Sequence, residues 1–337
     1  MSRSKSLDDI LRPFGIELYG VVNDSIPSSY PTYRSWISRG DHGELSYLAD
    51  ERCDKRENIK NYFPEFEQAL VMAFDYSKSS KIMNEFYNSS QSNGLKIASY
   101  VLGFEGMDYH FFVRDKLNEI SSALKEIDES LEIQFTLDTQ PILERDLAYK
   151  AGLGWFGKNS MLINQKKGSF FIIGSLLLSK KMFQKEETLD VDHCGNCTKC
   201  IDLCPTNAID KSHRTIIADK CISTYTIELF KDAKAPKGFE NSGGEIYGCD
   251  ICQDVCPWNI KVMKSLEISD SEKENFYKKN DDIISTFLKP SIDSIINFLE
   301  TLSNRKYRKK FHSSPIARTG RIGMLKNLRS IFSQKLK

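Results

Sequence analysis

The sequence has no apolar run long enough to cross a membrane. The longest, residues 170–178, has nine residues and contains Gly174 and Ser175, whereas a spanning helix needs about 20. The first ten residues also lack the apolar core of a secretory signal and a twin-arginine motif. We therefore expect a cytoplasmic protein without a membrane partner, and we predict that the apolar run is a buried strand.

Acidic residues are missing from the end of the chain. Residues 303–337 contain eleven Lys or Arg and no Asp or Glu, although the whole sequence has a net charge of only +1. Positions 1–302 accordingly hold 36 basic and 46 acidic residues. Such a cationic segment either attracts a polyanion, most simply a nucleic acid, or forms the solvated face of a helix. The charge pattern alone leaves both interpretations open.

A phosphate-binding Walker loop is also missing. Residues 152–157 match the form G-x-G-x-x-G, but a dinucleotide fingerprint lies between a strand and a helix. Here the motif follows a predicted helix and leads into a predicted strand. We therefore do not expect a nicotinamide site.

Cysteine, by contrast, is plentiful and falls into two runs, C-x2-C-x2-C-x3-C-P from Cys194 and C-x2-C-x3-C-P from Cys249. This spacing is typical of bacterial ferredoxins, in which the fourth cysteine of a run binds the other cluster. The second run lacks a first member, which Cys221 can supply from a separate loop. The pattern therefore predicts two [4Fe–4S] clusters, with Cys194, Cys197, Cys200 and Cys256 on one and Cys204, Cys221, Cys249 and Cys252 on the other.

Zinc is the alternative to iron and sulfide, because paired C-x2-C motifs also hold structural zinc. The proline after each terminal cysteine and the three-residue last spacing favour the clusters. Cys53 is the ninth cysteine, and we expect it to be a buried structural thiol. Since the chain has no export signal, its cysteines also favour a reducing compartment over disulfides.

The composition and the order of elements predict an α+β protein. With 337 residues, 40% hydrophobic and 28% charged, the chain can form two or three domains with cores of their own. We expect a mixed sheet, helices between its strands and a polar loop at residues 77–94. The predicted strands are residues 17–22, 69–75, 97–100, 131–137, 161–163 and 170–178, and the predicted helices are residues 7–11, 108–127, 142–150, 292–302 and 322–332.

A polar, charged linker near residues 182–190 separates this first part from the cysteine runs. We expect a catalytic domain at residues 1–185 and a ferredoxin-like double-cluster domain at residues 186–265. Residues 266–337 would form a short basic helical region.

Together the motifs resemble the epoxyqueuosine reductase family, cobalamin-dependent iron–sulfur enzymes that complete queuosine in tRNA. The resemblance rests on Gly103, on residues 108–110, 138–145 and 151–159, and on both cysteine runs. It extends over nearly the whole chain. Two features depart from the family pattern: many relatives continue into helical HEAT-like repeats, and Gln140 stands where relatives often carry a smaller residue.

The resemblance implies that residues 1–185 hold a base-off cobalamin on a nitroreductase-like fold. The implied reaction is the two-electron reduction of epoxyqueuosine at the tRNA wobble position, which gives queuosine and water. Clusters pass single electrons, so cob(I)alamin would accumulate two and attack the epoxide. Asp138 is the proton donor that the family motif implies, although an aspartate at this place can also simply cap a helix.

Further contacts with the corrin or the substrate are expected in or beside the matched motifs. Side chains in these motifs can equally be satisfied structural groups. We assign the contacts to Arg56, Tyr109, His110, Asp138, Lys158 and Asn159, and we place Tyr225 and Gln253 between the clusters and the corrin.

The expected partner is the anticodon stem-loop of a tRNA that carries epoxyqueuosine, held through phosphate contacts of the basic tail. A low-potential flavodoxin- or ferredoxin-type protein would supply electrons, and the enzyme would act as a monomer. Two other functions stay open, a reductive dehalogenase-like cobalamin reductase and a ferredoxin-type electron carrier. The missing export signal disfavours the first, and the long segment before the cysteines disfavours the second.

Overall fold

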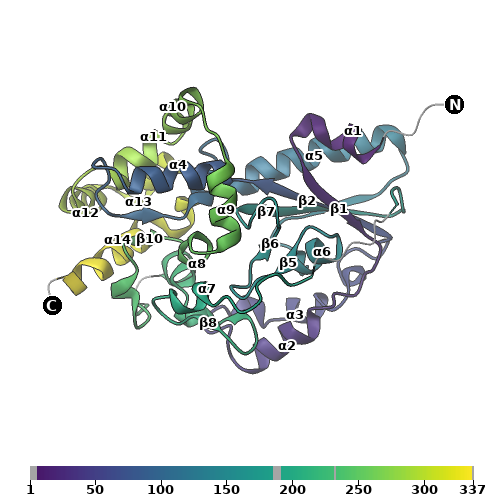
Figure 1. Cartoon of the computed structure of the whole chain (residues 1–337), viewed down its shortest axis with the longest axis horizontal. Helices are drawn as coiled ribbons and strands as arrows, with labels where there is room; N and C mark the ends of the chain where they lie inside the picture. Colours follow the sequence, from purple (N-terminus) through teal and green to yellow (C-terminus); the bar gives the residue numbers. More distant parts are fainter. Residues whose placement is uncertain (1–5, 185–190, 231–232, 336–337) are drawn as a thin grey trace.

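The computed structural model describes residues 6–184, 191–230 and 233–335, and its mixture of helices and strands confirms the α+β class. Figure 1 shows a sheet with flanking helices at one end of the molecule and a mainly helical part at the other. The strands are β1 (Leu18–Val22), β2 (Gln68–Asp75), β3 (Lys96–Ile97), β4 (Ile133–Thr136), β5 (Trp155–Phe156), β6 (Leu162–Ile163), β7 (Phe171–Leu178), β8 (Ile209–Asp210), β9 (Thr215–Ile216) and β10 (Glu245–Tyr247).

The helices range from single turns to 20 residues. None of those in the described ranges has both the length and the apolar character needed to span a bilayer. They are α1 (Leu7–Leu11), α2 (Tyr30–Ser38), α3 (Arg52–Lys55), α4 (Ser77–Tyr87), α5 (Tyr109–Ile127), α6 (Glu144–Lys150), α7 (Lys199–Asp202), α8 (Ile251–Asp254), α9 (Pro257–Ser265), α10 (Asp270–Lys279), α11 (Asp281–Ile283), α12 (Ile292–Thr301), α13 (Asn304–Lys310) and α14 (Ile316–Lys335).

The main sheet has the strand order β1-β2-β7-β4, and every neighbouring pair is antiparallel. The prediction of a mixed sheet is therefore wrong, because apolar patterning identifies strands but not the directions of their neighbours. The segment at residues 161–163 also lies outside this sheet. A tight turn, in which Ser160 N–H donates to Gly157 O at 3.0 Å, folds β6 back onto β5 in a separate hairpin.

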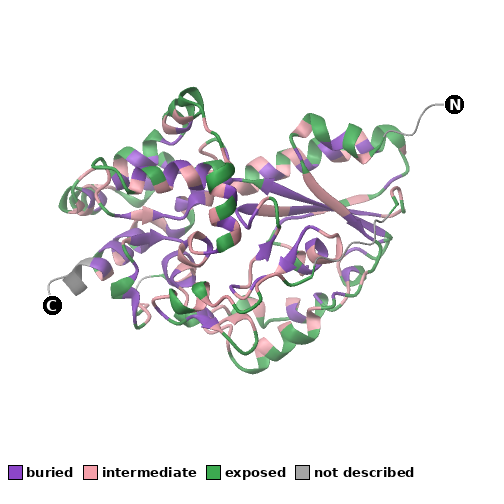
Figure 2. Cartoon of the chain, in the orientation of Figure 1, coloured by how far each residue is buried: buried purple, intermediate pink, exposed green. Residues whose placement is uncertain are grey.

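Both faces of the main sheet are covered, which explains the unbroken apolar sequence of β2. Leu70, Met72 and Phe74 pack in one core with α1 and α5, whereas Val71 and Ala73 pack in another with α6. The two sets alternate because successive strand residues point to opposite faces. Figure 2 shows these buried strands between helices whose outer faces are exposed.

The start of α5 is fixed by its cap. Asp108 is the N-cap residue, and its carboxylate accepts a hydrogen bond from the backbone N–H of His110 at 2.9 Å. Val113, Leu117 and Leu124 form the buried face of the helix, at the spacing of one helical stripe. The helix predicted at residues 108–127 is thus confirmed, and its capped end faces the site described below.

The structure contradicts the polar loop predicted at residues 77–94, because Ser77–Tyr87 forms the helix α4. Its buried apolar face consists of Ile82, Met83 and Phe86, and small serines at other positions allow close packing. The serine-rich composition concealed this helical spacing.

The strand predicted at residues 97–100 is also wrong beyond Ile97. Ser99–Leu102 forms a 3₁₀ turn, because the carboxylate of Asp250 accepts hydrogen bonds from both the backbone N–H and the hydroxyl of Ser99. The remaining short strand, β3, pairs in parallel with β10.

A third core joins α4, β3 and β10 to the helices α10–α14. Tyr307 and Phe311, at the end of α13, are completely or almost completely buried in it. The helix predicted at residues 322–332 lies within the longer α14, which is interrupted at Gly320 with φ 67°. The domain ranges 1–185, 186–265 and 266–337 remain predictions, and the boundary between the first two lies outside the described residues.

Candidate active site

Asp138 lies in the turn after β4, beside the first residues of α5. The hydroxyl of Tyr109 donates to Asp138 Oδ2, and His110 Nε2 lies 2.9 Å from Asp138 Oδ1. The rings of Tyr109 and His110 are stacked, with centroids 4.1 Å apart. The structure therefore brings together three of the residues that the sequence assigned to the site.

His110 lies between two carboxylates, since its Nδ1 is also 2.7 Å from Asp108 Oδ1. Burial lowers the pKa of His110, but hydrogen bonds with Asp108 and Asp138, and the charges of both, outweigh burial and raise the pKa to about 9. The imidazolium is consequently the main form at neutral pH and donates to both carboxylates.

Tyr109 completes the set of donors to Asp138. Burial raises the pKa of Tyr109, and the adjacent Asp138 raises it further, so Tyr109 stays a neutral phenol. The side chain of Asp138 is still 43% exposed. Its two oxygens are thus oriented by protein groups while one side of the carboxyl group remains open to a ligand.

Tyr47 interacts electrostatically both with Asp138 and with residues from the C-terminal part of the chain. Burial raises the pKa of Tyr47, the charges of Glu228 and Asp138 raise it further, and those of Arg318 and Arg56 lower it. As a whole residue, Tyr47 is 37% exposed. No sequence pattern identifies Tyr47 or Arg318, because the tertiary fold brings Tyr47 near both Asp138 and Arg318.

The eight cysteines of the two runs and the loop between them form two neighbouring groups. Burial raises the pKa of the Cys200 thiol to about 11, and Cys256, Cys194 and Cys197 contribute through their charges. Burial also raises the pKa values of the Cys252 and Cys249 thiols. The charges of Cys221 and Cys204 raise that of Cys252 further, and those of Cys252 and Cys221 raise that of Cys249 further. Crowded, partly buried thiols are unfavourable as thiolates until a cation neutralises them, so this donor set fits a thiolate-bound metal centre.

Short helices carry the central cysteines of the runs. Cys200 lies in α7 and Cys252 in α8, and these two helices contact each other. In the described chain, no three or more His, Cys, Asp or Glu side chains surround a single metal position. A cubane differs from a single ion in this respect, since each cysteine binds a separate iron.

The glycine-rich loop after α6 touches both cysteine runs. Lys158 Nζ donates to the carbonyl oxygens of Gly195 and Cys197 at 2.6 and 2.9 Å, and Asn159 Nδ2 donates to that of Cys252 at 3.2 Å. The sequence assigned Lys158 and Asn159 to the corrin or the substrate. In the structure their side chains are hydrogen-bonded to the backbone of the cysteine loops.

The other predicted contacts have partners other than Asp138. Arg56 is buried, with its guanidinium 5.6 Å from the ring centroid of Tyr33. Tyr225 is buried, and its hydroxyl lies 2.6 Å from Ser330 Oγ. Gln253 is buried as well, and its Oε1 accepts a hydrogen bond from the hydroxyl of Ser169 at 2.9 Å. Each side chain therefore has a structural partner.

Sequence reasoning missed two residues of the Asp138 turn. Gln140 Oε1 accepts a hydrogen bond from Leu137 N–H at 2.7 Å, and Glu144 Oε1 accepts one from Asp138 N–H at 2.6 Å. The turn delays the following helix, which begins at Glu144 and not at the predicted residue 142. Glu144 lay inside a quoted motif, but only the folded turn reveals which group it binds.

A third missed contact connects the site to the basic tail. The loop between α13 and α14 meets the cap of α5, where Asp108 N–H donates to Ser313 O at 2.5 Å. Asp108 also holds His110, so the basic helix α13 and the Asp138 site share one junction. No sequence pattern pairs these two segments.

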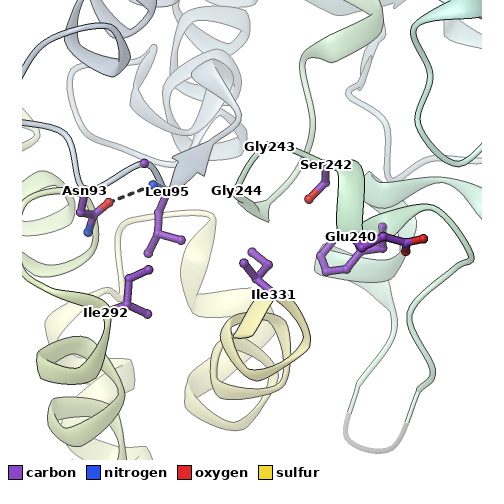
Figure 3. A pocket seen from close by; sticks show the side chains of 10 residues that line it. Asn93, Leu95, Glu240, Ser242, Gly243, Gly244, Ile292 and Ile331 are labelled. Atoms are coloured by element: carbon purple, nitrogen blue, oxygen red, sulfur yellow. Dashed lines mark hydrogen bonds between the residues drawn. The ribbon is translucent and has the colours of Figure 1, made fainter. Parts of the chain in front are cut away.

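Two cavities of the structure lie away from Asp138. One, of about 210 Å³, is lined by the segment before β3, the loop before β10, α12 and α14; Figure 3 shows Leu95, Ile292 and Ile331 around it. Another, of about 300 Å³, is lined by Tyr149, Trp155 and other residues near α6. Neither cavity is lined by a residue that the sequence assigned to the site.

Family models match two parts of the chain. Residues 56–139 match the model described as "Epoxyqueuosine reductase QueG, DUF1730", and residues 193–259 match the "4Fe-4S double cluster binding domain". The first match includes Tyr109, His110 and Asp138, and the second includes all eight cysteines. The chain therefore carries a domain for two [4Fe–4S] clusters.

Whole proteins are similar over most of the chain. The epoxyqueuosine reductase of Cyclobacterium marinum is 34% identical over 319 residues, which cover 93% of this chain and 92% of that protein. The structure of epoxyqueuosine reductase from Streptococcus thermophilus shares the fold, with a TM-score of 0.73 at 22% identity over 98% of this chain and 80% of that one. A further epoxyqueuosine reductase, crystallised with an epoxyqueuosine-modified tRNA-Tyr stem loop, has a TM-score of 0.71 at 22% identity over 96% and 79%.

Proposed function

The chain belongs to the epoxyqueuosine reductase family, and from this membership we propose that it reduces epoxyqueuosine to queuosine at the wobble position of tRNA. The observation that carries the proposal is the 34% identity to an epoxyqueuosine reductase across 93% of the chain. The alignment spans the Asp138 site and the cysteine domain together. The reaction consumes two electrons and two protons, opens the epoxide to an alkene and releases its oxygen as water.

The electrons would enter through the cysteine domain. We assign Cys194, Cys197, Cys200 and Cys256 to one [4Fe–4S] cluster and Cys204, Cys221, Cys249 and Cys252 to the other. Thiols within each group raise one another's pKa, which supports this grouping. Cys200 also raises the pKa of Cys252, which indicates that the two groups are neighbours. A low-potential flavodoxin- or ferredoxin-type protein would supply the electrons, in the cytoplasm and to a monomeric enzyme.

A base-off cobalamin would lie against the open side of Asp138. The residues there fit a flat cofactor: Tyr47 is an exposed aromatic residue, and the Asp138 carboxyl group is partly uncovered. When bound, cobalamin supplies a cobalt centre able to deliver two electrons together. The contacts of Lys158 and Asn159 with the cysteine loops would hold the clusters at a fixed place relative to this site.

Proton delivery is the part of the reaction that the chain's own residues perform. We propose that Asp138 relays a proton from His110, whose Nε2 lies 2.9 Å from Asp138 Oδ1, to the departing epoxide oxygen, after which His110 regains a proton from solvent. The raised pKa of His110, about 9, keeps that proton available at neutral pH. Tyr109, through its hydroxyl, fixes the other oxygen of Asp138.

The RNA surface that we propose is α13, where four cations lie on one short helix. Arg305, Lys306, Arg308 and Lys309 are exposed, and no ion pair between described residues involves any of them. Unpaired cations are free to bind phosphates. Through Ser313 this helix meets Asp108, so a stem-loop held along α13 would have its loop near Asp138.

Anaerobic reconstitution tests the proposal. The chain is loaded with iron, sulfide and cobalamin and incubated with an anticodon stem-loop that contains epoxyqueuosine and with a strong reductant. We expect mass spectrometry to show loss of one oxygen from the modified nucleoside. The matched control is the same preparation without cobalamin, which should contain iron but leave the epoxide intact. An intact epoxide with the fully loaded chain would refute the proposed function.

A further inference from the structure

The backbone of Asp138 has an unusual conformation. Its φ is 46°, in the left-handed region that residues other than glycine rarely adopt. Such a conformation persists only when surrounding contacts impose it, and it is frequent at functional sites. The contacts that impose it here come from side chains that follow Asp138 in the sequence.

Two side chains hold the turn from within. Gln140 Oε1 accepts the N–H of Leu137 at 2.7 Å, and Glu144 Oε1 accepts the N–H of Asp138 at 2.6 Å. The same oxygen of Glu144 also accepts the hydroxyl of Thr136 at 2.5 Å. Thr136 is fully buried in β4, so Glu144 connects the turn to a buried strand residue.

We propose that Glu144 is a positioning residue for the reaction: its Oε1 fixes the left-handed turn that directs the Asp138 carboxyl group toward Tyr109 and His110. Gln140 is the second anchor of the same turn. The inference rests on the proposed role of Asp138 as the proton donor. It explains why a residue in the first turn of α6 directs its oxygen to Asp138 and Thr136.

The protonation of Glu144 is consistent with this role. Burial raises its pKa to about 8; the hydrogen bond from Thr136 opposes this rise, and the charge of Asp138 adds to it. At neutral pH Glu144 is then mainly a neutral acid, whose Oε1 can act as a carbonyl acceptor without repelling Asp138. Glutamine has the same shape and the same acceptor, which makes Glu144→Gln the conservative variant.

A merely structural role for Glu144 would predict different results. An acidic residue in the first turn of a helix also stabilises that helix through its dipole, and glutamine does so much less. Glu272 offers a matched control, since it lies in the first turn of α10 and accepts the N–H of Ser269 at 2.9 Å. It has no contact with the Asp138 turn.

The test compares Glu144→Ala, Glu144→Gln, Gln140→Ala and Glu272→Ala as fully loaded enzymes. For Glu144→Ala we expect kcat on the epoxyqueuosine stem-loop to fall by about 10-fold to 10²-fold with little change in KM, because misplaced catalytic groups slow the reaction step. Gln140→Ala should show a smaller loss of the same kind. Glu144→Gln and Glu272→Ala should keep the wild-type kcat.

A second measurement needs no cofactor and no activity. Amide hydrogen exchange at residues 137–143 of the unloaded chain should be faster in Glu144→Ala than in wild type and unchanged in Glu144→Gln. Wild-type kcat and exchange in Glu144→Ala would overturn the inference, and so would a Glu144→Gln variant as impaired as Glu144→Ala. If the wild type does not reduce epoxyqueuosine, the proposed function fails, while the exchange rates still decide whether Glu144 holds the turn.

Discussion

The helix α13 and the Asp138 site use their charged groups in opposite ways. On α13 four exposed cations have no ion-pair partner among the described residues. At the site, Asp138 accepts from Tyr109 and His110, and His110 also contacts Asp108. One region thus leaves its charges for a partner, and the other uses its neighbours to orient a reacting group.

The neighbouring helix α14 shows that this difference does not follow from charge content. Its cations are already engaged: Arg318 with Glu228, Arg329 with Glu300, and Lys326 with the carbonyl oxygens of the segment at residues 225–229. Basic residues in one tail therefore divide into those that build the protein and those that remain available. The comparison predicts that changes at Asp138 affect turnover, whereas changes on α13 affect affinity.

Removing the acid at Asp138 should have the largest effect. We expect Asp138→Asn to lower kcat by ~10²–10⁴-fold, the usual contribution of a positioned acid. Asparagine keeps the shape and tolerates the left-handed backbone, so iron content, cobalamin content and stem-loop affinity should stay normal. Single-turnover kinetics measure the rate of reduction, and binding titrations measure the affinity for the stem-loop. Near-normal turnover would remove Asp138 from the reaction.

Reversing the charge of α13 should have the next largest effect, on binding alone. With Arg305, Lys306, Arg308 and Lys309 changed to Glu, we expect stem-loop affinity to fall on the order of 10²-fold and its salt dependence to weaken, because up to four phosphate contacts are lost. Turnover at saturating RNA should change little.

The control for this variant reverses four other exposed lysines, so that the net charge changes equally. Its affinity should remain close to wild type. Equal losses in both variants would show that RNA binding depends on overall charge and not on α13. The control lysines are Lys125, Lys166, Lys211 and Lys264.

A change of pH should separate the two regions further. The pKa of His110 is raised from 6.5 to about 9 in the folded chain, so its pairing with Asp108 and Asp138 stabilises the fold fully below pH 6.5. This contribution is lost as the pH rises toward 9, and kcat should fall with it. Thermal unfolding of wild type and His110→Gln across this window measures the effect. Parallel curves for the two proteins would contradict the assignment, and stem-loop affinity should vary less than kcat.

The smallest effect is expected on α14. Arg329 and Glu300 form an exposed pair at 2.6 Å, with 61% and 47% of their side chains exposed. Such pairs contribute at most about 1 kcal/mol, so Arg329→Ala should change the free energy of unfolding by less than that and leave RNA affinity nearly unchanged. A large loss of affinity would place α14 in the RNA surface and contradict the distinction between the cations of α13, unpaired among the described residues, and the engaged cations of α14. Urea denaturation and the same binding titration provide the two values.

The sequence predicted the parts of the site that depend on local spacing. The cysteine runs identify a double-cluster domain because the ligands of a cubane are close in sequence, and Asp138, Tyr109 and His110 stand in short motifs. The composition wrongly predicted a polar loop at α4, because serines surround Ile82, Met83 and Phe86 in the sequence.

Contacts between distant segments could not be predicted in this way. Nothing in the sequence indicates that Ser313 meets Asp108, or that Arg318 lies near Tyr47. The role of Gln140 becomes clear only when its side chain is seen to accept the N–H of Leu137. Such pairings depend on the three-dimensional arrangement of the elements, which spacing does not encode.

The junction between Ser313 and Asp108 bears on how this protein can be dissected. A shortened chain that ends before α13 would lose more than its cations, because Tyr307, Phe311 and Ile316 fill the third core and the cap of α5 would lose its acceptor. Deleting the tail would therefore damage the catalytic half as well. Recognition and chemistry in this protein can be studied separately only by exchanging single side chains in the intact polypeptide.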